Sequence, residues 1–327
     1  MKRVFITGCA GFIGFHLASF LSKKGEYVIG CDNFNNYYTP FLKKKRAALL
    51  QAEGIEVLNH DVQDLLALLP RLKKERITHI VHLAAQAGVR YSITHPQPYV
   101  DSNLDGFVQV LQLTRQLELP LIFASSSSVY GGNTKIPFSE TDPTESPISL
   151  YAATKKSGEL LAKSYHHLYG IPMTALRFFT VYGPWGRPDM AYFSFAEKIV
   201  KGKPLPVFNG GEMERDFTYI DDIIAGTASA IDHCNGFEIY NLGNHRPEKL
   251  MTLITLLEET LGEKALLDFQ PMQRGDVKST YADIDKAKSA LGFIPKTSLK
   301  EGIAKFSEWF LTLKETEKLQ EGTRSGR

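Results

Sequence analysis

The sequence of 327 residues contains few cysteines and carries almost no net charge. Cys9, Cys31 and Cys234 are too few and too scattered for a metal site or a disulfide framework, so a reducing compartment is expected. A formal net charge of +2 gives no particular attraction to nucleic acid or to a membrane surface. The composition therefore predicts neither a metal site nor a nucleic-acid partner.

Long apolar runs are also missing. No stretch is long and apolar enough to cross a bilayer, and the chain enters its first expected strand within a few residues, which argues against a signal peptide. A hydrophobic content of 43% allows sizeable cores, and the length is typical of about two domains. We therefore expect a cytoplasmic protein with no membrane partner.

Strand-like segments alternate with helical ones through the first 180 residues of the chain. Strands are expected at residues 3–6, 27–31, 56–59, 77–83, 121–125 and 173–177. Strands separated by helical segments imply right-handed crossovers. The sequence therefore predicts an α/β fold with a doubly wound parallel Rossmann sheet.

The character of the sequence changes after residue 180. A turn-rich segment at 182–188 precedes short strands mixed with helices, which predicts a smaller, mixed α/β substrate-binding domain at 181–327 beside a cofactor-binding Rossmann domain at 1–180. Segments near 217–230 and 237–243 are expected to return to the first domain. Ligands of open α/β sheets bind outside the carboxyl ends of the strands, so the substrate is expected between the two domains.

Three glycines follow the first strand at the start of a helical segment. Gly8 permits a tight turn, Gly11 lets backbone N–H groups approach a pyrophosphate, and Gly14 lets the helix pack closely on its strand. The spacing differs by one residue from the usual dinucleotide fingerprint, and a glycine triplet alone also fits an ordinary tight turn. Asp32 favours the nucleotide interpretation, because a carboxylate at a strand end can accept both ribose hydroxyls of NAD.

Charged residues near this loop refine the interpretation. Asp32 would repel the 2′-phosphate of NADP, and no arginine or lysine directly follows it, so the sequence predicts NAD. Asp61 closes another strand-like segment, where it can meet the adenine or be simply a polar strand end. The basic run at residues 43–46 is expected to cover a solvated helix face.

Tyr151 and Lys155 stand one helical turn apart and share a helix face. An unperturbed tyrosine has a pKa near ~10, and a nearby ammonium and a nicotinamide cation are expected to lower it. The serines at 125–128 end a strand, where hydroxyls can hydrogen-bond a reacting alcohol or carbonyl. The Tyr-x-x-x-Lys spacing alone also fits a surface helix, but its order after the glycine loop, Asp32 and the serines favours a catalytic pair.

With its Thr-Gly-x-x-Gly-x-x-Gly segment, strand-end serines and Tyr-x-x-x-Lys, the sequence resembles the extended short-chain dehydrogenase/reductases from residue 2 to about residue 310. Within that superfamily it is most similar to the UDP-glucuronate 4-epimerases. The segments that carry this similarity are DNFNNYY at 32–38, LAAQAGVRYS at 83–92 and LRFFTVYGPWGRPDMA at 176–191. The resemblance implies an NAD-dependent isomerase that acts on a UDP-sugar and forms a homodimer.

The resemblance also assigns roles to individual residues. It gives catalytic roles to Tyr151 and Lys155, and to Ser126 in preference to Ser128 as the hydroxyl at the sugar C4. The residues expected to bind NAD are Gly8, Gly11, Phe12, Ile13, Gly14, Asp32, Asn33, Asp61, Val62, Leu83, Ala84, Ala85, Tyr151 and Lys155. Those expected to bind the UDP-sugar are Gln86, Arg90, Ser127, Ser128, Thr180, Arg187, Val207, Phe208, Arg215 and Arg274.

Two arginines and an apolar pair match the part of the family site that holds UDP. Arg215 and Arg274 match the arginines that bind the UDP moiety, and a diphosphate does need fixed, permanently charged forks. Val207 and Phe208 match the segment that lines the uracil pocket, although a buried hydrophobic strand explains them equally well.

A second set of residues matches groups at the sugar carboxylate. Arg187, Thr180 and Arg90 are expected to bind it, with the alternative that Arg187 merely braces its proline-rich loop. Hydroxyls of Ser127, Ser128 and Thr180 are expected to keep the carboxylate away from the alignment that releases CO₂.

The implied reaction is C4 epimerisation of UDP-glucuronate to UDP-galacturonate through a 4-keto intermediate, with Tyr151 as the base and NAD as the hydride carrier. The alternatives on the same fold are UDP-galactose 4-epimerase, UDP-glucuronate decarboxylase and nucleotide-sugar 4,6-dehydratase, and a non-catalytic NAD-binding sensor is a more distant one. By resemblance, decarboxylases and dehydratases carry Glu just before Val-Tyr-Gly, where this chain has Ser128. A sensor has no need for a phenolate base.

Overall fold

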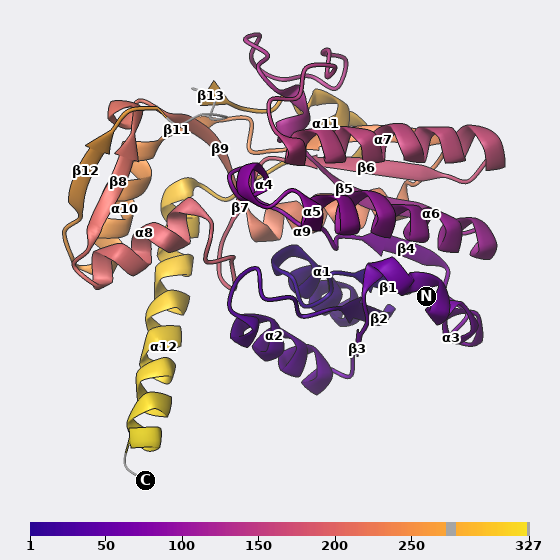
Figure 1. Ribbon diagram of the computed structural model, residues 1–327, viewed down its shortest axis with the longest axis horizontal. Coiled ribbons are helices and arrows are strands. Elements are labelled where there is room, and N and C mark those ends of the chain that lie inside the picture. Colours follow the sequence, from indigo (N-terminus) through magenta and orange to yellow (C-terminus); the bar gives the residue numbers. More distant parts are fainter. Residues whose placement is uncertain (273–278, 326–327) are drawn as a thin grey trace.

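A parallel seven-stranded sheet forms the centre of the molecule (Figure 1). The computed structural model describes residues 1–272 and 279–325. The strand order is β10-β6-β5-β4-β1-β2-β3. These strands are β1 (Arg3–Thr7), β2 (Tyr27–Asp32), β3 (Glu56–Asn59), β4 (His79–His82), β5 (Leu121–Ser126), β6 (Met173–Phe178) and β10 (Phe237–Leu242). The predicted doubly wound parallel sheet is confirmed.

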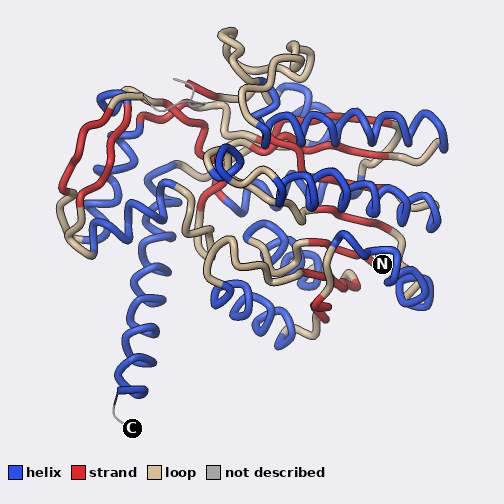
Figure 2. The backbone as a smooth tube through the Cα atoms, in the orientation of Figure 1, coloured by secondary structure: helices blue, strands red, loops and turns tan. Residues whose placement is uncertain are grey.

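Helices cover both faces of the sheet (Figures 1 and 2). One face carries α3 (Leu69–Lys74), α6 (Gly106–Leu117) and α7 (Leu150–Tyr169), and the other carries α1 (Phe12–Lys23), α2 (Pro40–Ala52), α9 (Ile220–Asp232) and α11 (Asp285–Leu291). Short helices fill several connections, namely η1 (Val62–Leu68), α4 (Tyr91–Thr94), α5 (Gln97–Val100), η2 (Asp101–Asp105) and η3 (Ser127–Tyr130).

The strand sequences explain why both faces are covered. In β6 every residue is buried, and in β1 only the first is not, as expected for strands packed on two sides. Side chains alternate between the faces, so Phe5 joins the core that includes Phe107 of α6, whereas Ile6 joins the core that includes Leu17 of α1. Right-handed crossovers with helices on both faces satisfy this pattern.

The later part of the chain builds two smaller sheets beside the first. One contains β7 (Thr180–Tyr182), β9 (Glu214–Tyr219), β11 (Pro247–Lys249) and β13 (Ser279–Thr280), and the other contains β8 (Pro204–Phe208) and β12 (Leu266–Gln270). The accompanying helices are α8 (Ala191–Val200), η4 (Asn209–Gly211), α10 (Leu250–Leu261) and α12 (Leu299–Ser325). They lie to the left of the large sheet in Figure 1.

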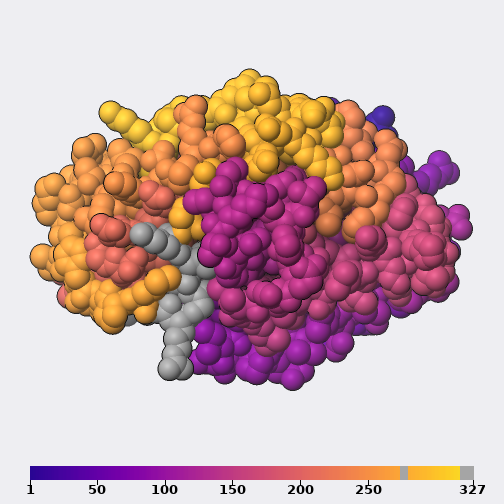
Figure 3. Space-filling view, turned by 90° about the horizontal axis from the view of Figure 1, so that it is seen from above, coloured from indigo at the N-terminus to yellow at the C-terminus, as the bar shows by residue number. Residues whose placement is uncertain are grey.

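Two later segments lie with the large sheet. β10 pairs with β6 at its edge, and α9 packs against α1. We keep 1–180 and 181–327 as a proposed division of the chain, with these segments attached to the first part. Figure 3 shows the chain that follows β5, in magenta, seated between the two parts, where Phe138 pairs with Ala282. Within residues 1–272 and 279–325, no helix is long and apolar enough to span a bilayer.

Candidate active site

A cavity of about 980 Å³ lies at the carboxyl ends of the central strands, where the smaller sheets meet the large one. Its wall takes residues from the loops after β1, β2, β4 and β5, and from β7, β8 and β9 on the other side. Open α/β sheets bind their ligands at this edge. The cavity therefore brings together segments that are far apart in the sequence, from Gly8 to Thr280.

The glycine loop exposes backbone at one end of the cavity. Gly8 has a φ of +70°, and a Cβ atom at this position would lie 2.6 Å from the backbone nitrogen of Ala84. The Gly11 N–H donates to the Gly8 carbonyl at 2.9 Å, and α1 begins directly afterwards with its N-terminus at the cavity. Free N–H groups at a helix N-terminus attract an anion, so this end fits a dinucleotide pyrophosphate.

Asp32 lies on the cavity wall at the end of β2. It is buried, and its Oδ1 accepts the N–H of Phe34 at 2.9 Å. Burial raises the pKa of Asp32, and the nearby Lys43 ammonium opposes this shift. The carboxylate remains placed to accept ribose hydroxyls, with Asn33 beside it on the cavity wall.

Asp61 does not reach the cavity. Among the described residues its neighbours His60 and Val62 line the wall, whereas its own carboxylate accepts the Asn33 side-chain N–H at 2.7 Å and the Gln63 N–H at 3.0 Å. The Asp61 side chain therefore caps η1 and holds Asn33. The direct contact with the cofactor that the resemblance implies is not supported by this placement.

The prediction of a solvated basic face at 43–46 is wrong for two residues. Lys43 and Arg46 are buried, three residues apart on the inner face of α2, whereas Lys44 is exposed. The Lys43 Nζ donates to both the carbonyl and the side chain of Asn35, at 2.9 and 2.6 Å. Helical spacing within the basic run was the signal that could have separated the buried pair from the exposed residues.

Tyr151 and Lys155 lie together on the cavity wall at the start of α7. The Ser149 side chain caps the helix, which fixes its first turn. Tyr151 is hydrogen-bonded to Ser126, and the Lys155 Nζ donates to the carbonyl of Ala124 at 3.0 Å. The end of β5 and the start of α7 thus place a phenol, a serine hydroxyl and an amine in one region.

The pKa of Tyr151 is raised, contrary to the prediction from sequence. Burial raises it, and the Ser126 hydrogen bond and the Arg187 charge oppose this only in part. Burial also lowers the pKa of Lys155 to about 8, with a further contribution from Arg187. In the protein chain itself, desolvation of Tyr151 therefore outweighs the Ser126 hydrogen bond and the Arg187 charge.

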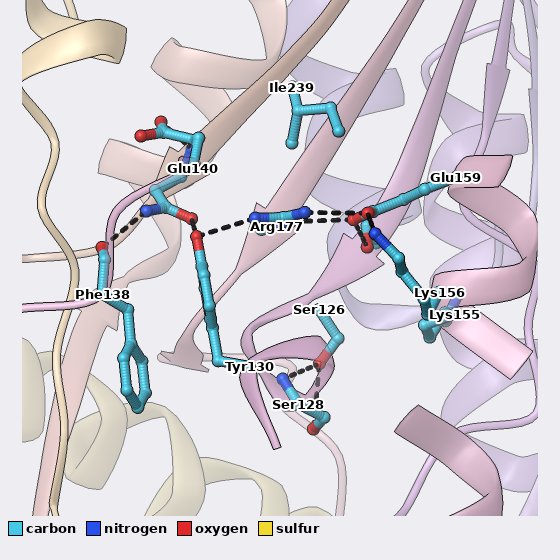
Figure 4. A network of polar contacts seen from close by, with 12 residues as sticks. Ser126, Ser128, Tyr130, Phe138, Glu140, Lys155, Lys156, Glu159, Arg177 and Ile239 are labelled. Atoms are coloured by element: carbon cyan, nitrogen blue, oxygen red, sulfur yellow. Dashed lines mark hydrogen bonds and ion pairs between the residues drawn. The ribbon is translucent and has the colours of Figure 1, made fainter. Parts of the chain in front are cut away.

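The serine run is ordered around Ser126. Its Oγ accepts the Ser128 N–H at 3.1 Å and donates to the Ser128 Oγ at 3.2 Å (Figure 4). Ser126, Ser127 and Ser128 all line the cavity, but Ser126 is the one hydrogen-bonded to Tyr151.

A buried polar network lies behind the serines and α7 (Figure 4). Arg177 forms a two-pronged ion pair with Glu159, each contact 2.8 Å long, and its Nη1 donates to the Tyr130 hydroxyl at 3.0 Å. Ser125 donates to Glu159 at 2.6 Å, and Tyr130 donates to Asn241 of β10 at 2.7 Å. The network ties α7 to three strands. A glutamate two helical turns after Tyr151 was its only visible signal in the sequence.

The opposite wall contains the residues predicted for the nucleotide sugar. Arg90 lies with its guanidinium 4.9 Å from the centre of the Phe208 ring, and both line the cavity together with Arg215 and Gln86. Val207 is fully buried in the core instead, because neighbouring residues of β8 point to opposite faces. The prediction of Val207 as a pocket residue is therefore wrong. Arg274 lies outside the described residues.

Thr180 and Arg187 also line the cavity. The Arg187 guanidinium pairs with Asp189 in its own loop, as the bracing alternative predicted, and its charge also acts on Tyr151 and Lys155. Arg187 therefore both braces its loop and faces the site.

A model of the NAD dependent epimerase/dehydratase family matches residues 4–243. The chain belongs to this family. Because the match covers most of the chain, from β1 through β10, it includes the whole central sheet and the Tyr151 region.

Relatives and solved structures agree with this assignment. UDP-glucuronate 4-epimerase 3 of Arabidopsis thaliana is 47% identical over 94% of this chain and 76% of its own length. An uncharacterised protein of Methanocaldococcus jannaschii is 52% identical over 96% of this chain and 98% of its own. The structure of UDP-glucuronic acid 4-epimerase from Bacillus cereus, in complex with UDP-glucuronic acid and NAD, superimposes with a TM-score of 0.89 at 36% identity and covers 95% of this chain and 100% of that chain.

The charge of the epimerase-family cavity is strongly one-sided. The described residues that line it include two carboxylates, Asp32 and Asp189, and six basic side chains, Lys43, Arg90, Lys155, Arg187, Lys198 and Arg215. In the part of the chain that the structure describes, no three His, Cys, Asp or Glu side chains are grouped to hold a metal ion. The excess of basic side chains on the described wall suits an anionic ligand.

Proposed function

We propose that this chain is an NAD-dependent UDP-glucuronate 4-epimerase, an isomerase that converts UDP-glucuronate to UDP-galacturonate. One observation carries the proposal: Tyr151, hydrogen-bonded to Ser126 and one turn from Lys155, shares a cavity with Arg187 and Thr180. A proton-transfer group and groups able to bind a carboxylate thus face one space. The similarity to the plant and bacterial UDP-glucuronate 4-epimerases supports this substrate.

The end of the cavity at the glycine loop is suited to NAD. The glycine loop would receive the pyrophosphate, Asp32 the adenosine ribose, and Lys155 the nicotinamide ribose, with Leu83, Ala84 and Ala85 along the cofactor. Phe12, Ile13, Gly14, Asn33 and Val62 complete this wall. When bound, NAD would supply reversible hydride chemistry at the sugar C4.

Tyr151 is the proposed proton-transfer group. We assign it as the group that takes the proton of the C4 hydroxyl and later restores it, with Ser126 hydrogen-bonded at the same oxygen. Because burial raises the Tyr151 pKa in the chain alone, the phenolate needs positive charge around it. The Arg187 charge acts in this direction, and we assign the same role to Lys155, one helical turn away. The buried Glu159–Arg177 pair keeps α7 in place against β5 and β6.

The UDP moiety must be held while the hexose turns. We assign Arg215 and Arg90 to the diphosphate, because guanidinium forks bind phosphate oxygens in two directions. Phe208 offers an apolar face for the uracil. Arg274 keeps the diphosphate role implied by resemblance, and Gln86 is proposed to contact the sugar.

Retention of the carboxylate distinguishes this activity from decarboxylation. Ser127, Ser128 and Thr180 line the cavity near the catalytic helix and offer hydroxyls to the carboxylate. Of the two carboxylates on the described cavity wall, Asp32 lies at the cofactor end and Asp189 is already paired with Arg187. Neither is placed as an acid beside Val129, so the wall favours epimerisation.

We also propose a homodimer and a cytoplasmic location. On α7, Leu160 and Leu168 are 56% and 64% exposed and lie two turns apart, and this apolar pair suits a copy of the same surface. Light scattering of the purified protein is expected to give the dimer mass, and Leu160→Lys to give the monomer. The free cysteines agree with a reducing compartment.

The experiment is a timed incubation of the purified protein with UDP-glucuronate carrying deuterium at C4. We expect UDP-galacturonate as the product with the label retained at C4, because the hydride stays on a tightly held cofactor. Predominant UDP-pentose and CO₂ would make the chain a decarboxylase. Loss of the label to solvent would exclude hydride transfer, and a marked preference for UDP-glucose would exclude the proposed substrate.

A further inference from the structure

The Arg187 guanidinium is held by Asp189, which is held in turn by Tyr37, and the sequence singled out neither residue. Its Nε donates to Asp189 Oδ1 at 3.0 Å and its Nη2 donates to Asp189 Oδ2. A guanidinium has five N–H groups, so this side-on pair leaves the edge formed by Nη1 and the second Nη2 hydrogen unused by Asp189. Arg187, Asp189 and Tyr37 all line the cavity.

Tyr37 completes the arrangement from the cofactor side. Its hydroxyl donates to Asp189 Oδ2 at 3.0 Å, the oxygen that also accepts from Arg187. Burial, together with the Asp189 charge, raises the pKa of Tyr37, so its hydroxyl keeps its proton and stays a donor. Gly88, with a φ of +98°, lies against this hydroxyl, where any Cβ atom would collide with it.

The pair itself is electrostatically favourable despite partial burial. Burial alone would raise the pKa of Asp189, but the Arg187 charge and the Arg187 and Tyr37 hydrogen bonds outweigh it and lower the pKa. The two side chains are only 23% and 26% exposed, so solvent screening is limited. Asp189 is therefore a permanent anion beside Arg187 at neutral pH.

The backbone of the loop that carries Arg187 is held by side chains of α1 and α2. Arg46 donates to the carbonyls of Trp185 and Gly186 at 2.7 and 3.0 Å, and to Ala10 in the glycine loop at 3.0 Å. Burial lowers the pKa of His16 to about 4, so its ring is neutral at pH 7, and its Nε2 contacts the Pro184 carbonyl at 2.9 Å. The loop and its side chains are thus both anchored to the cofactor-binding part.

We propose that Asp189 and Tyr37 are positioning residues that orient Arg187, so that its free edge binds the carboxylate of a hexuronate and the site prefers that sugar to a neutral hexose. The inference rests on the proposed function. Asp189 holds the guanidinium plane by one edge, and Tyr37 keeps Asp189 from turning. Without them the long Arg187 side chain loses its direction, and a two-point contact with a second carboxylate depends on direction.

The test measures binding of UDP-glucuronate and UDP-glucose by calorimetry, with NAD-loaded protein. All variants are made in a Tyr151→Phe parent, so that no turnover occurs. We expect Asp189→Asn to weaken UDP-glucuronate binding by about tenfold, because it removes the charge that pairs with Arg187. We expect Tyr37→Phe to weaken it by about threefold, because it removes one hydrogen bond to Asp189 and leaves the Arg187–Asp189 ion pair. The affinity for UDP-glucose is expected to change by less than about twofold in both variants.

Tyr27→Phe is the matched control. This change also removes a tyrosine hydroxyl that donates to a carboxylate, because Tyr27 donates to Glu75 at 2.9 Å. Tyr27 begins β2 and so lies at the amino ends of the strands, away from the cavity. We expect it to leave both affinities unchanged. Bound NAD and the melting temperature are measured for each variant, and Tyr37→Phe remains informative if Asp189→Asn does not fold.

Three results would overturn the inference. Equal losses for both sugars would show a general structural role, and tighter UDP-glucuronate binding in Asp189→Asn would show that Asp189 only repels the substrate. An unchanged preference in both variants would show that Arg187 needs no orientation. A parent protein without any preference for UDP-glucuronate would overturn the proposed function as well, so the two failures are distinguishable.

Discussion

The cofactor end of the cavity is built largely from backbone, whereas the sugar end is built from long side chains. At the cofactor end Gly8 brings main chain within reach of a ligand, and the N-terminus of α1 supplies N–H groups. At the sugar end Arg90, Arg187 and Arg215 come from three separate segments. A backbone site tolerates no added atoms, while a side-chain site depends on what holds each side chain in place.

Tyr151 lies where the two ends meet, and its removal is expected to have the largest effect. Tyr151→Phe should lower turnover of UDP-glucuronate by about 10³-fold or more, because general acid–base contributions reach that size and the hydride step depends on the same group. Both binding ends should survive, so bound NAD and the affinity for UDP-glucuronate are measured beside the rate. Near-normal turnover would contradict the role assigned to Tyr151.

A methyl group at Gly8 tests the backbone end. Gly8→Ala is expected to expel NAD and to destabilise the protein by about 3 kcal/mol, since the strain of a positive φ adds to a collision with Ala84. Gly25→Ala is the control: Gly25 has a φ of +82°, but nothing lies within 4 Å of its Cβ position. It should cost only about 1 kcal/mol and keep NAD. Equal behaviour of the two variants in thermal unfolding and cofactor content would contradict this view of the loop.

Arg187→Met tests the side-chain end. It is expected to raise KM for UDP-glucuronate by about 10–100-fold while bound NAD stays unchanged, because hydrogen bonds to a charged group are lost. It should also move the acid limb of the pH–rate profile to higher pH, since the Arg187 charge lowers the pKa of Tyr151 and its removal lets that pKa rise. An acid limb that moves to lower pH would contradict the effect of Arg187 on Tyr151. A loss of bound NAD as large as the loss of UDP-glucuronate binding would contradict the separation of the cofactor end from the sugar end.

Lys155→Met is expected to stabilise the cofactor-free protein, whereas the other variants lose stability, binding or turnover, and its effect is the smallest. Burial lowers the Lys155 pKa from 10.5 to about 8. Below pH 8 the side chain is charged in both the folded and the unfolded chain, and the buried charge makes the folded protein less stable. The variant should gain about 2 kcal/mol at pH 7, after the lost hydrogen bond to Ala124 is deducted. The gain should shrink as pH rises from 8 to 10.5, where the unfolded chain also loses its proton. Denaturant unfolding of cofactor-free protein at several pH values measures it, and a gain that grows with pH would contradict the assignment.

Much of the fold was predictable from local patterns. The six strands expected in the first 180 residues all appear within two residues of their predicted ends, because alternating strand and helix segments restrict the topology. The helical spacing of Tyr151 and Lys155 and the strand-end position of Ser126 also follow from chain geometry alone. The seventh strand, β10, pairs with β6, which lies more than about sixty residues earlier in the chain. The sequence predicted only that the segment near 237–243 returns to the first domain, and not that it adds a strand to the sheet.

The sequence by itself determined the glycine loop, Asp32 and the Tyr151–Lys155 pair, because each depends on spacing within one strand or one helix turn. The tertiary structure decided which residues are buried and what they touch. It placed Val207 in the core and Phe208 at the cavity, buried Lys43 and Arg46, and joined Tyr37 to Asp189 across 152 positions of the chain. It also raised the Tyr151 pKa, since desolvation depends on every element packed around a group and not on its neighbours in sequence.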